Sequence, residues 1–110
     1  MATYGETIAL PEAEAETEQD KSPLFSIILF NDEEHTYGYV IEMVAKLFDK
    51  SQQEAFEIAY EVDYIGQAVV KTCPYEEAVV GCKQILKYGP DPILGYSRGS
   101  MKAIVQEAEG

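Results

Sequence analysis

A short polar stretch, Asn31-Asp32-Glu33-Glu34-His35, brings amide, carboxyl and imidazole groups together directly after an apolar run. The run covers residues 24–30 and has the length of a buried strand. We therefore expect these polar groups at the end of a strand, beside an apolar surface. That combination suits recognition of a small cationic group attached to a hydrophobic side chain.

Two other chemistries are conceivable for this stretch. His35 could form an acid–base pair with Asp32 or Glu34, but no motif supplies a nucleophile. The four side chains of residues 32–35 could also hold a metal ion. Adjacent turn residues rarely converge on one ion, however, and their spacing matches no calcium-binding loop. We therefore expect no enzyme, no metal and no other cofactor. The simplest structural role is that Asn31 and Asp32 form a turn and cap the next helix.

Asp63, in the segment Val62-Asp63-Tyr64, is the second candidate. It is expected just after the end of a helix. A carboxylate there meets the negative end of the helix dipole, at a cost of a few tenths of a kcal/mol to about 1 kcal/mol. A solvated loop aspartate is the simplest interpretation. The functional alternative is a second acceptor that faces Asp32.

Length and composition limit the class of protein. The chain has 110 residues, which suits one domain, and a net charge of −12, which disfavours nucleic acid and anionic membranes as partners. Neither a signal peptide nor an apolar run of about 20 residues is present, so we expect a cytoplasmic protein. Cys73 and Cys82 are expected to be free thiols, the first at a helix cap and the second in the core.

The N-terminal part differs in composition from the rest. Residues 1–20 contain six acidic side chains and no basic one. We expect residues 1–22 to form a disordered acidic tail and residues 23–107 to form the folded domain.

Within that domain, the residue pattern predicts alternating strands and helices. Ser51 and Glu54 form an S-x-x-E capping box, which marks the start of the second helix. The expected elements are a strand at 24–30, helices at 37–48 and 52–62, a strand at 67–72, a helix from Pro74 to a stop at Gly89-Pro90, a loop at 90–99 and a strand at 100–106. The order β-α-α-β-α-β predicts an α+β fold: a two-layer sandwich with a three-stranded antiparallel sheet and three helices on one face.

Over residues 23–106 the chain resembles the ClpS adaptors, which bring N-degron substrates to the Clp protease unfoldase. Asn31-Asp32-Glu33 is similar to that family's N-D-D or N-D-E turn, and Val62 to Ala68 follows its V-H-Y-x-G-x-A motif. The spacing from Asn31 to Ala68 matches without a gap. Further matching segments are Val40-Ile41-Glu42-Met43, Lys46-Leu47-Phe48, Glu54-Ala55, Glu76 with Ala78, and the final strand.

The resemblance implies a binding module without catalytic activity. A peptide's free α-ammonium would be held by Asn31, Asp32 and Asp63. Its first side chain (Leu, Phe, Tyr or Trp) would enter a pocket lined by Tyr37, Val40, Ala59, Val62 and Met101. Glu76 would meet an AAA+ Clp unfoldase of the ClpA or ClpC type, and the acidic tail would assist delivery.

The chain departs from the family pattern at several positions. Asp63 replaces the family's His, so that two carboxylates would repel each other when no ligand is bound. Tyr37 and Ala59 stand where Met residues are common, which would narrow the mouth of the pocket and deepen its floor. Gly81 stands where many members have a Lys that contacts the unfoldase. The loop before the last strand is longer and includes Arg98, which would contact peptide, partner or solvent.

These departures leave a second function open. The chain would then be an α+β protein-interaction module that no longer reads N-termini and binds a different protein, as the C-terminal domain of the ribosomal stalk protein does.

Overall fold

The computed structural model describes residues 23–108, and the acidic tail expected at residues 1–22 lies outside them. The predicted element order β-α-α-β-α-β is confirmed. The elements are β1 (Phe25–Phe30), α1 (Tyr37–Phe48), α2 (Gln52–Ile65), β2 (Gln67–Cys73), α3 (Tyr75–Leu86) and β3 (Ala103–Glu107). None of the helices within residues 23–108 is both long and apolar enough to cross a membrane.

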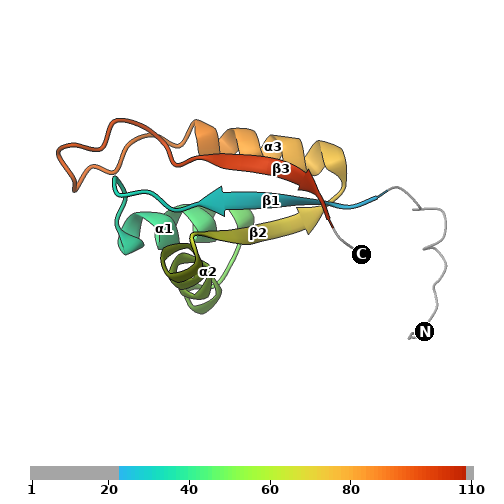
Figure 1. Ribbon diagram of the computed structural model, residues 1–110, viewed down its shortest axis with the longest axis horizontal. Coiled ribbons are helices and arrows are strands. Elements are labelled where there is room, and N and C mark those ends of the chain that lie inside the picture. The colour runs from blue at the N-terminus through green and yellow to red at the C-terminus, as the bar shows by residue number, and fades with distance from the viewer. Residues whose placement is uncertain (1–22, 109–110) are drawn as a thin grey trace.

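The three strands form one antiparallel sheet in the order β2-β1-β3, with the helices packed on one side of it (Figure 1). Ile27 and Leu29 of β1 are completely buried. Ile28 points to the other face, but its register partners Val69 and Ile104 flank it and leave it 5% exposed. The first strand is buried as predicted and lies at the centre of the sheet, and the predicted two-layer α+β architecture is confirmed.

The N-cap of α1 is Thr36, whose hydroxyl accepts a 3.2 Å hydrogen bond from the Tyr39 N–H. The prediction that Asn31 and Asp32 cap this helix was wrong. The Asp32 carboxylate instead accepts a 2.9 Å hydrogen bond from the Glu34 N–H within its own turn. Five further residues separate Asn31 from α1, so a cap at the end of the strand could not reach the first helical N–H groups.

Helix α2 begins with the predicted capping box of Ser51 and Glu54, which is confirmed. It ends at Ile65 and not at Val62, because Gly66 supplies the left-handed residue (φ 108°) that closes the helix. Asp63 therefore lies within the last turn of α2, and the prediction that it follows the helix was wrong. The apolar pattern could not show this extra turn, since Tyr64 and Ile65 are exposed.

Helix α3 begins directly after Pro74 and ends at Leu86, and Glu76 and Glu77 lie in its first turn as expected. Cys73 was expected at a helix cap but is the buried last residue of β2, opposite Phe25. Both cysteines are free and buried.

The last strand begins at Ala103, opposite Leu29, and not at Ser100. The preceding Lys102 carbonyl still accepts a 3.0 Å hydrogen bond from the Phe30 N–H. Met101 therefore enters the core just before regular pairing with β1 begins, and it is 2% exposed.

Gly81 of α3 faces Ile27 of β1 and Phe48 of α1. A Cβ at this position would lie 2.7 Å from Ile27 Cδ1 and 2.9 Å from Phe48 Cε1. The position therefore faces the core, and the effect of Gly81 on unfoldase docking stays a prediction. A side chain here would force Ile27, Phe48 or helix α3 to shift.

Candidate functional site

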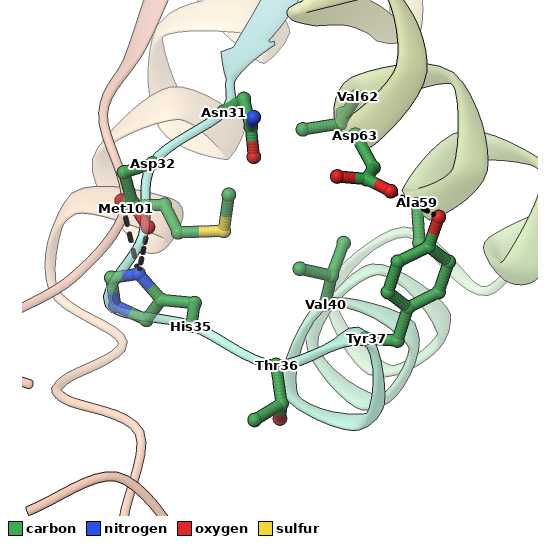
Figure 2. Close-up of a pocket in the computed structure, with 10 residues that line it drawn as sticks. All are labelled: Asn31, Asp32, His35, Thr36, Tyr37, Val40, Ala59, Val62, Asp63 and Met101. Carbon is green, nitrogen blue, oxygen red and sulfur yellow. Dashed lines mark hydrogen bonds and ion pairs between the residues drawn. The ribbon is translucent and has the colours of Figure 1, made fainter.

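A cavity of about 70 Å³ opens between α1, α2 and the segment before β3 (Figure 2). All eight residues predicted for the α-ammonium site and the hydrophobic pocket line it, although they come from distant parts of the chain. They are Asn31, Asp32, Tyr37, Val40, Ala59, Val62, Asp63 and Met101, and the cavity adds His35 and Thr36. The structure thus brings the set together, while its role in binding stays a prediction.

The floor of the cavity is apolar. Val40 comes from α1, Ala59 and Val62 come from α2, and Met101 comes from the segment before β3. Each is 5% exposed or less, and Figure 2 shows the Val40 and Val62 side chains directed into the cavity. The small Ala59 leaves room that a longer side chain would occupy. A hydrophobic group could therefore enter here and lose its contact with water.

The rim is polar. Figure 2 shows the Asn31 amide and the Asp63 carboxylate directed toward the space above the floor, from opposite sides. The Asn31 N–H donates a 2.9 Å hydrogen bond to the Gly66 carbonyl, which fixes the end of β1 beside the end of α2. Two acceptors from different elements thus face one opening.

Tyr37 joins α1 to α2 at the mouth of the cavity. Its hydroxyl donates a 2.8 Å hydrogen bond to Asp63 Oδ2. This hydrogen bond is the main cause that raises the pKa of Tyr37, so the hydroxyl keeps its proton at neutral pH. No sequence pattern predicted this pair, because the two residues are 26 positions apart.

His35, which the sequence suggested only as an acid–base or metal residue, holds Asp32 in place. Its Nδ1 lies 2.8 Å from Asp32 Oδ1, and its Nε2 lies 2.7 Å from the Gly99 carbonyl oxygen. The imidazole is 2% exposed. Neither oxygen has a hydrogen to donate, so only the doubly protonated ring makes both hydrogen bonds.

The expected repulsion between the two carboxylates stays a prediction. Each carboxylate has a partner of its own, because His35 contacts Asp32 and Tyr37 donates to Asp63. Figure 2 also shows the Asp32 carboxylate turned toward His35, away from Asp63.

Asp91 supports the site from the loop before β3. It is 2% exposed and accepts hydrogen bonds from the Thr36 N–H (2.7 Å), the Thr36 hydroxyl (2.8 Å) and the Ile93 N–H (3.0 Å). Burial alone would raise the pKa of Asp91. These hydrogen bonds and the nearby His35 outweigh burial and lower that pKa below its ordinary value. The only signal in the sequence was an aspartate between two prolines in a loop.

The same loop is attached to the acidic turn at a further point, since the Arg98 N–H donates a 3.0 Å hydrogen bond to Glu34 Oε1. Arg98 thus contributes its backbone to the site, and the residue itself is exposed. Within residues 23–108, no three His, Cys, Asp or Glu side chains are grouped so that they could hold a metal ion.

Glu76 lies apart from the cavity. It is exposed in the first turn of α3 and borders a groove formed with Pro23, Phe25, Pro74 and Tyr75. Phe25 begins β1 and Asn31 follows its end, so the groove and the cavity lie at opposite ends of this strand. A partner at Glu76 would therefore leave the cavity accessible.

Comparison with known proteins agrees with this arrangement. The family model described as "ATP-dependent Clp protease adaptor protein ClpS" matches residues 20–91, which is more than half of the chain. The chain belongs to the ClpS family. This result confirms the resemblance inferred from the Asn31-Asp32-Glu33 turn and from the spacing of the motifs after it.

Curated ClpS adapter proteins are similar along parts of their length. The chain is 40% identical to the ClpS adapter of Nautilia profundicola over 57 residues, which are 52% of this chain and 59% of that protein. It is 29% identical to the ClpS adapter of Shewanella loihica over 86 residues, which are 76% of this chain and 84% of that protein. The match to the ClpS adapter of Treponema denticola spans 61% of that protein. The chain therefore covers about three fifths of the length of the Nautilia and Treponema proteins.

The fold also matches a solved ClpS structure. Agrobacterium tumefaciens ClpS2 bound to L-phenylalaninamide superposes with a TM-score of 0.69, at 18% identity, over 80% of this chain and 100% of that one. At this identity the match establishes the fold.

Proposed function

We propose that this ClpS-family protein is a non-enzymatic adaptor that binds the free α-ammonium and the bulky first side chain of substrate proteins. The adaptor then presents these substrate proteins to an AAA+ Clp unfoldase for degradation. The observation that carries the proposal is the cavity in which a buried apolar floor meets acceptors from the turn after β1 and from α2. An ammonium group attached to a hydrophobic side chain is the ligand that fits such a pair of surfaces.

Three acceptors are available for the three N–H donors of an ammonium. They are the Asn31 amide oxygen, the Asp32 carboxylate and the Asp63 carboxylate. His35 and Tyr37 each use part of one carboxylate, but a carboxylate oxygen has a further lone pair to offer. Asp63 in this role would replace a single imidazole acceptor with a charged one, which suits a cationic ligand.

The expected affinity follows from a few contributions. Burial of a Leu or Phe side chain contributes about 1.5 to 3 kcal/mol. Each hydrogen bond to a charged group contributes about 1.5 to 3 kcal/mol. After the loss of translational and rotational freedom, a short peptide should bind with a micromolar Kd.

The size of the cavity favours Leu as the first residue. About 70 Å³ accommodates a handful of water-sized groups, which is closer to a branched aliphatic side chain than to an indole. The solved Agrobacterium tumefaciens ClpS2 is bound to L-phenylalaninamide, which also combines a free amine with a bulky side chain. We therefore propose Leu as the preferred first residue, followed by Phe and Tyr, with Trp last.

The decisive experiment compares a peptide that begins with Leu with the same peptide after N-acetylation, using fluorescence anisotropy. Acetylation removes the positive charge and two donors but leaves the side chain unchanged. We expect micromolar binding of the free peptide and at least a tenfold loss on acetylation. Equal binding of both peptides would contradict α-ammonium recognition.

One observation favours a different function. The Tyr37 hydroxyl already occupies Asp63 and spans the mouth of the small cavity. If neither peptide binds, the chain is better explained as an interaction module for another protein partner.

Delivery can be tested apart from peptide binding. We propose that Glu76 on α3 contacts a ClpA- or ClpC-type unfoldase. The exchange Glu76→Lys should weaken co-purification with that unfoldase and leave peptide affinity unchanged, because the residue lies at the other end of β1 from the cavity. Loss of both activities would indicate misfolding and would not support a docking role.

A further inference from the structure

Helix α2 carries three exposed aromatic rings, Phe56, Tyr60 and Tyr64, which we call the α2 ladder. They are spaced four residues apart and so share one side of the helix. The Phe56 and Tyr60 rings lie 6.4 Å apart, and the Tyr60 and Tyr64 rings lie 5.4 Å apart and within 10° of parallel. The three residues are 45%, 50% and 78% exposed. Rings that remain so exposed add little to the core.

The α2 ladder is continuous with the cavity. Tyr37, which lines the mouth, lies 6.0 Å from the Phe56 ring. At the other end of the ladder, Tyr64 directly follows Asp63 of the polar rim. A peptide whose first residue occupies the cavity would therefore leave it beside these rings.

The charge around the α2 ladder has a single sign. The helix contains Glu54, Glu57, Glu61 and Asp63, all exposed, and no Lys, Arg or His. Aromatic faces attract cations, and neighbouring carboxylates add to that attraction. Acidic segments, including those of this chain, would be repelled. A basic segment is therefore the occupant that this surface fits.

We propose that the α2 ladder is a second contact surface for the substrate peptide and recognises Arg or Lys in the two positions after the first residue. The inference rests on the proposed function and extends it, because it assigns a sequence preference beyond the first residue. A guanidinium stacked on Tyr60 or Tyr64 at an exposed site should improve affinity roughly two- to fivefold for each basic residue.

The experiment uses three peptides of equal length that begin with Leu and have Arg-Arg, Ala-Ala or Glu-Glu at the next two positions. Their Kd values are measured by fluorescence anisotropy at about 150 mM salt, where distant charges are screened. The wild-type protein should bind the Arg-Arg peptide roughly four- to twenty-fivefold more tightly than the Ala-Ala peptide, with the Glu-Glu peptide weakest.

The variant Tyr60→Ala/Tyr64→Ala tests the rings directly and keeps every acidic residue. It should bind the Ala-Ala peptide as the wild type does and should lose most of the preference for Arg-Arg. Tyr75→Ala is the matched control, because Tyr75 is an exposed helical tyrosine (55%) at the end of β1 away from the cavity. This control should keep the full preference.

The outcomes separate the inference from the proposed function. Equal affinity for the Arg-Arg and Ala-Ala peptides would overturn the inference and leave α-ammonium recognition intact. A preference that survives loss of both tyrosines would also overturn it, because the acidic charge alone would then be responsible. If no peptide with a free amine binds, the proposed function fails and the inference fails with it.

Discussion

His35 holds Asp32 with its Nδ1 2.8 Å from one carboxylate oxygen and 3.0 Å from the other. The second ring nitrogen is bound to the Gly99 carbonyl, so the imidazole connects the acidic turn after β1 to the loop before β3. This contact determines where the Asp32 carboxylate lies, and it does so from a side chain that is almost completely buried. The proposed ammonium site therefore depends on a residue that need not touch the ligand.

The protonation of His35 can be observed directly, because it is the only histidine in the chain. Both ring nitrogens face oxygen acceptors, so the two hydrogen bonds form together only when each nitrogen carries a proton. The ¹⁵N chemical shifts of the ring, measured by NMR, report this state without ambiguity. A neutral tautomer at pH 7 would show that one of the two hydrogen bonds is absent in solution.

The exchange Asp32→Asn should weaken binding of a Leu-first peptide by at least tenfold. It removes the charge that faces the ammonium, and such a hydrogen bond contributes about 1.5 to 3 kcal/mol. The fold should persist, since the amide oxygen can still accept from His35, whereas Asp32→Ala would leave the buried ring without that partner. Anisotropy titration measures the peptide affinity, and a thermal melt measures whether the fold persists. Unchanged affinity would mean that the ammonium binds elsewhere.

The Tyr37 hydroxyl and the bound ammonium should compete for Asp63. We expect Tyr37→Phe to strengthen peptide binding by a few fold, because it releases the carboxylate that accepts the 2.8 Å hydrogen bond. The gain should disappear when Asp63→Asn is also present, since no charged acceptor then remains to be released. A double-mutant cycle of the four Kd values measures this coupling. An equal gain in affinity from Tyr37→Phe with and without Asp63→Asn would indicate that a wider cavity mouth is the cause.

Asp91 should make stability depend on pH in acid. Its pKa is lower in the folded protein than its ordinary value of 3.8, so the folded state is stabilised above that value. This contribution is lost as the pH falls below about 4 and through the lower folded pKa. The variant Asp91→Asn should be less stable at pH 7 by about 1 to 3 kcal/mol. As the pH falls below 4, the free energy of unfolding in urea should also decrease less for the variant than for the wild type. Parallel plots of this free energy against pH for the two proteins would contradict this role of Asp91.

Gly81→Ala should destabilise the fold whether or not a ligand is bound. The added Cβ would lie 2.7 Å from Ile27 Cδ1 and 2.9 Å from Phe48 Cε1, so side chains or helix α3 must shift. Overpacking of this kind costs about 1 to 3 kcal/mol. Urea unfolding measures the loss, and Gly95→Ala is the control, because a Cβ at Gly95 has no heavy atom within 4 Å. Equal stability of the two variants would mean that the side chains or helix α3 shift at little cost in free energy.

Most of the fold could be predicted from local patterns in the sequence, and the membership of the site could be predicted from the resemblance to the ClpS family. The apolar run before Asn31 specified the central strand, and the Ser51–Glu54 pair specified the start of α2. Helix ends were harder to predict, since the exposed residues 64 and 65 carry no apolar periodicity. Gly66 closes α2 only after them.

The family resemblance of the sequence was enough to predict which side chains meet at the cavity, from Asn31 and Asp63 at the rim to Val40 and Met101 on the floor. How those groups are paired could be read only from the folded structure. His35 with Gly99, Thr36 with Asp91 and Tyr37 with Asp63 are separated by 64, 55 and 26 positions. A hydrogen bond depends on distances of about 3 Å and on direction, which no pattern of residue types contains. These contacts arise only when packing of the core fixes the loop before β3 against the turn after β1.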